Sequence, residues 1–117
     1  MTDRELLEKA AKAADMNTGG WAVDISKGMR LQDNYGDFLR FWNPLTDDGD
    51  ALRLAVKLQL TVANEHVSAG VAYCTDVDDN VFQVVRSGGN QSEVIAEDYA
   101  ATRRAIVRAA AAIGESL

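Results

Sequence analysis

Apolar residues recur at helical spacing near the end of the chain. The repeat follows intervals of three and four positions through Tyr99, Thr102, Ile106, Ala110, Ile113 and Leu117. This period predicts an amphipathic helix over residues 97–114, because such spacing puts one apolar stripe on a helix.

Two further helices are predicted upstream. Thr2 and Glu5 form a capping-box pattern before an apolar face rich in leucine and alanine, and the helix that follows is expected to end near Asp15. Apolar positions at helical spacing after residue 50 predict a helix to about residue 58, with Thr46 or Asp47 as its N-cap.

The segments between these helices have the composition and spacing of strands. Trp21, Val23 and Ile25 alternate with other residues, which predicts a strand over residues 20–25. Residues 29–31 are a short candidate strand, and a strand over residues 38–42 is expected to stop before the Asn43-Pro44 pair.

A three-stranded meander is predicted in the second half, over residues 60–63, 67–74 and 81–85, followed by a loop at 87–92. The order is then α-β-β-α-β-β-β-α. The expected fold is α+β, a small α/β/α sandwich in which helices pack a mostly antiparallel sheet, with residues 1–117 as a single domain.

Composition and charge narrow the function classes. The chain has 117 residues, 47% of them hydrophobic and 26% charged, as in ordinary globular domains. Its longest apolar run covers residues 109–113, which is too short to span a bilayer, and no signal sequence is visible, so we expect a cytoplasmic protein. A formal net charge of −6 disfavours direct binding to nucleic acid or to anionic membranes.

The lone cysteine and the lone histidine exclude several site classes. Cys74 has no cysteine partner for an internal disulfide, and His66 has no second histidine for a two-histidine zinc site. We interpret Cys74 as a buried hydrophobe and His66 as part of a polar turn. The alternative is a nucleophilic pair formed by Cys74 and His66.

Two acidic clusters have a structural and a metal-binding interpretation. Asp47, Asp48 and Asp50 stand where a helix is predicted to begin, so they suit helix capping, and a divalent ion is the alternative. The stretch at residues 76–80 imitates a calcium loop, but Val81 and Ser87 occupy positions where that loop requires glycine and glutamate. A hairpin turn is therefore predicted there, and residues 87–90 are interpreted as a plain loop in preference to an anion cradle.

Arginines and aromatic residues supply the candidate interaction surface. Arg103, Arg104 and Arg108 form a basic patch on the last predicted helix, which either pairs with nearby acids such as Asp98 or with the acidic loops, or meets an acidic partner. Five aromatic residues crowd the first half of the chain, and they belong to the core unless one or two are interface anchors: Trp21, Tyr35, Phe38, Phe41 and Trp42.

Three segments resemble the phage "ABA sandwich" domain, a small family carried by bacteriophages and prophages. They are residues 42–56 (WNPLTDDGDALRLAV), the helix at 99–110 (YAATRRAIVRAA) and the helix at 6–14 (LLEKAAKAA). Residues 20–35 and 64–90 depart from the family pattern. The resemblance implies a mixed sheet sandwiched by helices in a phage or prophage setting, with no established activity and no functional residues to carry over.

The function expected from these features is a non-catalytic accessory protein that binds another protein of the host or the phage, as a monomer or a homodimer. No metal and no cofactor are expected. The candidate surface comprises Tyr35, Trp42, Arg103, Arg104 and Arg108. Two alternatives remain, an acidic DNA mimic that blocks a nucleic-acid-binding protein, and a metal-dependent hydrolase or nuclease that uses the cluster at residues 47–50.

Overall fold

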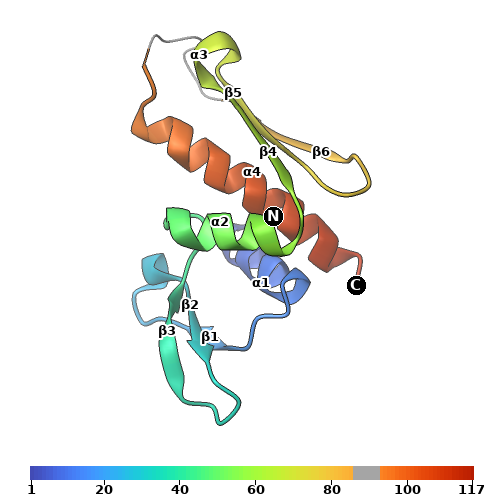
Figure 1. Cartoon of the computed structure of the whole chain (residues 1–117). Helices are drawn as coiled ribbons and strands as arrows, with labels where there is room; N and C mark the ends of the chain where they lie inside the picture. The colour runs from blue at the N-terminus through green and yellow to red at the C-terminus, as the bar shows by residue number, and fades with distance from the viewer. Residues whose placement is uncertain (86–92) are drawn as a thin grey trace.

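The fold alternates helices with two groups of three strands (Figure 1). The structure is a computed structural model that describes residues 1–85 and 93–117. Its elements are α1 (Asp3–Ala13), β1 (Thr18–Trp21), the 3-10 helix η1 (Ile25–Lys27), β2 (Met29–Gln32), β3 (Phe38–Trp42), α2 (Asp48–Lys57), β4 (Thr61–Glu65), α3 (His66–Ala69), β5 (Val71–Thr75), β6 (Val81–Val85) and α4 (Ala96–Glu115). The expected α+β class is confirmed.

The strands form two separate antiparallel sheets. The first sheet has the order β1-β2-β3 and the second sheet has the order β4-β5-β6. The resemblance implied one mixed sheet, and the described strands differ from it because α2 carries the chain from the first sheet to the second. Helices α1, α2 and α4 lie between the two sheets (Figure 1). Helix α4 packs on the strands of the second sheet, and both α1 and α2 pack on α4.

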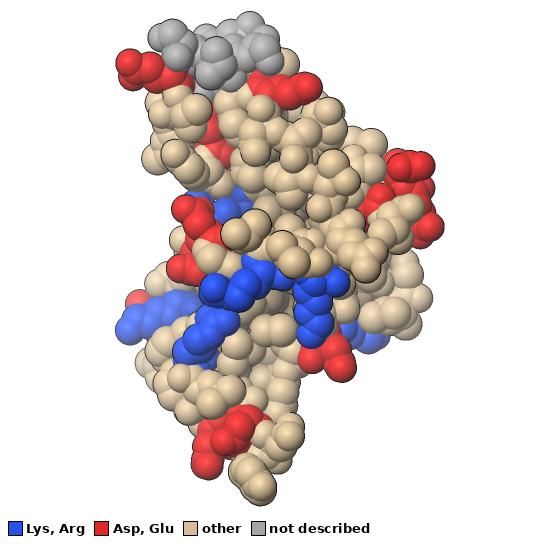
Figure 2. Space-filling view, viewed as in Figure 1, with Lys and Arg blue, Asp and Glu red and all other residues tan. Residues whose placement is uncertain are grey.

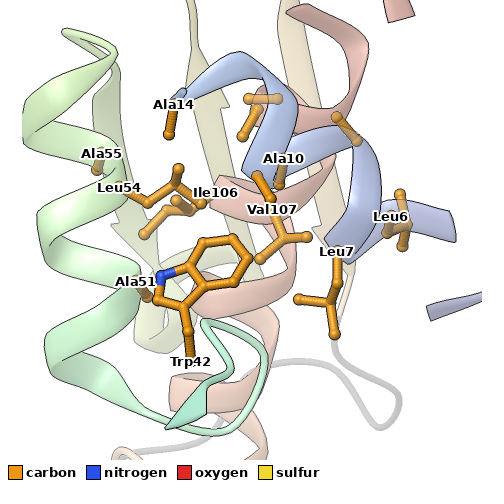
Figure 3. Close-up of a cluster of buried hydrophobic side chains, with 14 of the residues drawn as sticks. Leu6, Leu7, Ala10, Ala14, Trp42, Ala51, Leu54, Ala55, Ile106 and Val107 are labelled. Atoms are coloured by element: carbon orange, nitrogen blue, oxygen red, sulfur yellow. The ribbon is translucent and has the colours of Figure 1, made fainter. Parts of the chain in front are cut away.

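Trp42 lies at the centre of the main core cluster. Its side chain is 2% exposed and is surrounded by apolar residues of α1, α2 and α4 (Figure 3). The residues labelled there are Leu6, Leu7, Ala10, Ala14, Ala51, Leu54, Ala55, Ile106 and Val107. Met29 and Leu31 of β2 join the same cluster, so the first sheet shares one core with the three helices.

Alanine and glycine let α1 and α4 approach closely. Ala10, Ala105 and Ala109 are fully buried, and a Cβ added at Gly114 would overlap the backbone carbonyl oxygen of Lys9. A side chain at this position would therefore force the two helix backbones apart. The Lys9 ammonium also reaches the Glu115 carboxylate at 2.9 Å across the same contact.

The sequence pattern located most helix ends and caps. The Thr2 hydroxyl accepts the Glu5 N–H at 3.1 Å, and Asp47 caps α2 by accepting the Asp50 N–H at 2.8 Å. The last helix begins and ends within a residue of its predicted limits, at Ala96 and Glu115. Both β2 and β3 lie where strands were expected, and β3 ends at Trp42.

The strand predicted over residues 20–25 is wrong in its position. Strand β1 covers Thr18–Trp21, and the chain then turns into η1, where Asp24 accepts hydrogen bonds from the Ser26 N–H and hydroxyl at 3.1 and 2.7 Å. Val23 and Ile25 are exposed, so the alternating positions Trp21, Val23 and Ile25 do not form one buried face of a strand. The hydrogen bonds of the Asp24 side chain stabilise a turn here, although the alternating sequence pattern favours a strand.

The meander was right in outline and wrong at its second strand. Residues 66–69 form the short helix α3, which ends at Gly70 in the left-handed conformation, φ +65°. Strand β5 therefore begins at Val71, four residues later than predicted. The loop expected at 87–92 lies outside the described residues.

We expect Gly114→Ala to lower the free energy of unfolding by about 3 kcal/mol, because the new Cβ overlaps the Lys9 carbonyl and a packed interface cannot relax without moving a helix. Urea denaturation measures the change. Gly49→Ala is the matched control, since an added Cβ there meets only the end of the Arg53 side chain and the Asp47 carboxylate. Equal midpoints for Gly114→Ala and the wild type would contradict the close backbone contact.

Candidate functional site

The residues predicted to form an interaction surface divide into exposed, buried and ion-paired positions. Tyr35 is 91% exposed in the turn between β2 and β3, as an interface anchor requires. Trp42 is 2% exposed, so it belongs to the core and cannot contact a partner in this fold. The reason is its place at the end of β3, where its side chain enters the space between α1 and α2.

The arginines of α4 are engaged within the chain. Arg103 donates to the Asp48 carboxylate at 2.7 Å and to the Leu45 carbonyl at 2.8 Å. Arg104 makes a two-pronged pair with Asp3, at 2.8 and 3.1 Å. The interpretation that these arginines pair with acids of the chain is confirmed for Arg103 and Arg104, whose partners are Asp48 of the acidic cluster at residues 47–50 and Asp3 in place of Asp98.

The Arg104 pair ties the start of α1 to α4. The hydrogen bonds from Arg104 hold the pKa of the Asp3 carboxyl below its ordinary value. Arg108 donates to the Gln83 carbonyl of β6 at 3.4 Å, a longer contact. The three arginines thus reach α1, the corner before α2, and the second sheet.

The acidic cluster at residues 47–50 builds the corner between β3 and α2. Asp47 is the N-cap of α2, and Asp48 pairs with Arg103. Asp50 has a side chain that is 4% exposed, and it accepts hydrogen bonds from Arg40 at 2.7 Å, Arg53 at 2.9 Å and the Asn43 N–H at 3.0 Å. The capping interpretation is confirmed for Asp47.

The environment of Asp50 favours its charged form. Desolvation by burial raises the pKa of this carboxyl, but the hydrogen bonds from the Asn43 N–H, Arg53 and Arg40 outweigh it and leave the pKa below its ordinary value of 3.8. Asp50 thereby holds the two arginines against the corner. Within residues 1–85 and 93–117, no group of three histidine, cysteine, aspartate or glutamate side chains is arranged to hold a metal ion.

His66 joins a buried polar cluster that sequence reasoning missed. His66 is 6% exposed and Asp98 of α4 is fully buried, with His66 Nδ1 and Asp98 Oδ1 3.3 Å apart. On the other side of the ring, Nε2 lies 3.0 Å from the Thr102 hydroxyl. Carboxylate, imidazole and hydroxyl follow one another in the order of a nucleophilic triad.

The Thr102 hydroxyl has several hydrogen-bond partners. It lies 2.7 Å from the Asn64 side-chain oxygen and 3.0 Å from the Asp98 carbonyl, and both of these groups accept hydrogen bonds. The hydroxyl has one proton for these acceptors and for His66 Nε2, whose role as donor or acceptor depends on the ring tautomer. These contacts join β4, α3 and α4 as a polar clamp.

A hollow of about 450 Å³ lies beside this clamp, between α2, β4 and α4. Its lining is mainly apolar and includes Leu52, Val62, Tyr99 and Ile106. The spacing of Asp98 and Thr102, four residues apart on one predicted helix, was visible in the sequence. That His66 faces both of them depends on how β4 crosses α4, which the sequence pattern does not contain.

Cys74 lies in the core, where its thiol has low reactivity. It is fully buried in β5, and desolvation, followed by the nearby Asp76 charge, raises the pKa of its thiol to about 11. This confirms the interpretation of Cys74 as a buried hydrophobe. His66 was expected at a polar turn, and it is the first, buried residue of the short helix α3.

The stretch at residues 76–80 forms the predicted hairpin turn between β5 and β6. The Asp76 carboxylate accepts the N–H groups of Asp78 and Asn80, each at 2.9 Å, and the Asn80 side chain at 3.0 Å. These bonds lower the pKa of the Asp76 carboxyl, and the Asn80 side chain makes the largest contribution. The oxygens of Asp76 thus organise the turn.

A second hollow, of about 660 Å³, opens between the first sheet and the start of α2. It is lined by Lys27, Arg40 and Arg53 together with Phe41, Asn43, Thr46, Asp47 and Asp50. Figure 2 shows that Lys and Arg gather in a band across the middle of this face, between α2 and the first sheet, whereas Asp and Glu lie in separate groups around it. The sequence shows no cluster here because the cations come from distant segments.

Comparison with known proteins adds no relative: no family model, no curated protein and no solved structure matches the chain. In the part of the chain that the structure describes, no helix combines the length and the apolar character needed to cross a bilayer. The site must therefore be judged from its own geometry.

We expect Asp50→Asn to lower the free energy of unfolding by about 2 kcal/mol near neutral pH, because the amide keeps the Asn43 contact and loses both ionic bonds. A carboxylate with a lowered folded pKa stabilises the fold above its unfolded pKa and loses this effect as the pH falls through the folded value. The difference between wild type and variant should thus shrink below about pH 4. Urea denaturation at several pH values measures it.

Asp47→Asn is the control for this experiment, because asparagine caps a helix as well as aspartate and the Asp47 side chain is 58% exposed. Its stability should stay within about 0.5 kcal/mol of the wild type. A difference between Asp50→Asn and the wild type that stays constant down to the acid range would show that the charge of Asp50 contributes nothing.

We expect the Cys74 thiol to resist modification in the folded protein. A pKa of about 11, against 9.0 for an ordinary thiol, leaves about a hundredfold less thiolate at mildly alkaline pH, and burial blocks access besides. Reaction with an aromatic disulfide reagent, followed by absorbance, should be slow in buffer and complete in denaturing urea. A fast reaction in buffer would place Cys74 at the surface.

Proposed function

We propose that this chain is a non-catalytic domain that binds another protein through the outer end of the first sheet. The supporting observation is a group of large apolar side chains at that end: Tyr35, Phe38 and Leu39 are 91%, 45% and 60% exposed. Exposed side chains of this type are typical anchors of protein interfaces because they bury a large area on contact.

The sheet edge favours the same function. Strand β3 is the last strand of the first sheet, so its outer backbone groups face away from β2, and it carries both Phe38 and Leu39. An open edge beside apolar side chains is a surface on which another chain can dock. The candidate surface therefore moves from the arginines of α4, which are engaged within the chain, to the end of the first sheet.

Catalysis is disfavoured in this proposal by the chemistry of the polar clusters. The Asn64 oxygen, 2.7 Å from the Thr102 hydroxyl, competes with His66 for its one proton, and burial of Cys74 suppresses its thiolate. The carboxylates at residues 48 and 50 already pair with arginines. The phage or prophage setting, which the resemblance at residues 42–56 implies, makes the partner a host or phage protein in the cytoplasm of the host cell.

The proposal is tested by affinity capture with the wild type, the double variant Tyr35→Ser with Leu39→Ser, and a control double variant. The control, Val77→Ser with Val81→Ser, removes two exposed apolar side chains near the turn of the second sheet. A partner enriched by the wild type and the control should be lost with Tyr35→Ser/Leu39→Ser, by at least about tenfold in Kd when both proteins are purified.

Titration calorimetry measures that Kd, and urea midpoints verify that all three chains fold. If all three chains capture the same partner with equal affinity, the end of the first sheet is not the contact surface. If no captured protein binds the wild type when both proteins are purified, the binding function itself is rejected.

A further inference from the structure

Basic and aromatic side chains from four segments meet around the edge strand β3, and the surface that they form is here called the basic face. It comprises Lys27 of η1, Arg30 of β2, Phe38, Arg40 and Phe41 of β3, and Arg53 and Lys57 of α2. Arg40 and Arg53 line both the 660 Å³ hollow and the smaller one that contains Lys57, which joins the sheet to the helix.

The aromatic rings connect the cations to one another. The Arg30 guanidinium lies 4.4 Å from the centroid of the Phe38 ring, and the Lys27 ammonium lies 5.6 Å from that of Phe41. The two rings are 5.0 Å apart, tilted by 55°. This alternation holds Arg30 and Lys27 beside apolar surfaces, an arrangement that suits a ligand with both acidic and apolar groups.

The carboxylates beside the basic face are already engaged. Asp24 accepts the Ser26 N–H and hydroxyl, Asp47 caps α2, and Asp50 binds Arg40 and Arg53. The two hollows are lined by four cations, Lys27, Arg40, Arg53 and Lys57, and by two carboxylates, Asp47 and Asp50, which leaves an excess of two positive charges there in a chain whose net charge is −6. Arg40 and Arg53 remain 46% and 63% exposed, so each can still donate to a ligand.

We propose that the basic face binds an acidic, partly apolar segment of the partner protein. This inference rests on the proposed function and specifies the chemistry of the partner. Carboxylates of the segment would meet Lys27, Arg40 and Arg53, while its apolar side chains would cover Phe38 and Phe41. Phe38 belongs both to this face and to the exposed end of the first sheet, so one partner can cover both.

An acidic peptide suits this surface better than a nucleic acid. A long polyanion would meet the negative field of the whole chain, and acidic groups surround the basic band (Figure 2). A short segment contacts only the band itself, and its apolar side chains add contacts with the phenylalanine rings that a phosphate backbone lacks.

The experiment uses a synthetic peptide of alternating glutamate and valine residues, and the same peptide with glutamine in place of glutamate. Titration calorimetry at low and at physiological salt measures the Kd for the wild type, for Lys27→Glu with Lys57→Glu, and for a control with the same change of charge. The control, Arg4→Glu with Lys12→Glu, alters α1 outside the basic face. A short single-stranded DNA is titrated in parallel.

We expect the glutamate peptide to bind the wild type, more weakly as salt is raised, and the glutamine peptide to bind at least about tenfold more weakly. Lys27→Glu/Lys57→Glu should weaken binding of the glutamate peptide by at least about tenfold, and the control by less than about twofold. Absence of binding to the glutamate peptide, equal losses for the two variants, or tighter binding of the DNA would each overturn the inference.

Failure of this inference is distinguishable from failure of the proposed function. A captured partner that is lost with Tyr35→Ser/Leu39→Ser and retained with Lys27→Glu/Lys57→Glu would leave the binding function in place and reject its acidic chemistry. Loss of that partner with both variants supports the inference.

Discussion

The contact between α1 and α4 is the interaction on which the rest of the fold depends. Small side chains on both helices and the absence of a side chain at Gly114 allow the two backbones to approach. Helix α4 then carries the second sheet on its other side, while α1 and α2 enclose Trp42 at the end of the first sheet. Both sheets are three-stranded and neither is buried on two faces, so each relies on this helical layer for its apolar contacts.

The corner at Asp50 connects this scaffold to the candidate surface. One buried carboxylate accepts from the backbone at Asn43 and from arginines of β3 and α2. It thereby fixes the first sheet relative to α2 and orients two cations that would otherwise be mobile in solvent. The motif that looks like a metal site in the sequence is thus the support of a cationic surface, because arginines occupy the positions that an ion would need.

The distribution of charge gives the molecule distinct surfaces despite its acidic total. Arginines of α4 neutralise Asp3 and Asp48 within the fold, whereas the cations that line the two hollows beside β3 outnumber the carboxylates there. Exposed apolar side chains adjoin the same region at the end of the first sheet. A protein partner with acidic and apolar groups is consistent with both features, and it requires no group that performs chemistry.

Local signals in the sequence determined helices α1, α2 and α4, the caps at Thr2 and Asp47, the end of β3 before Pro44 and the turn at Asp76, since each depends on neighbours a few residues away. The same local signals misplaced β1 and β5, where the Asp24 cap and α3 prevailed over strand propensity. Tertiary structure alone decided the burial of Trp42, the meeting of His66 with Asp98 and the assembly of the basic face. These contacts join residues that are far apart in the chain, and their geometry follows from how the helices pack.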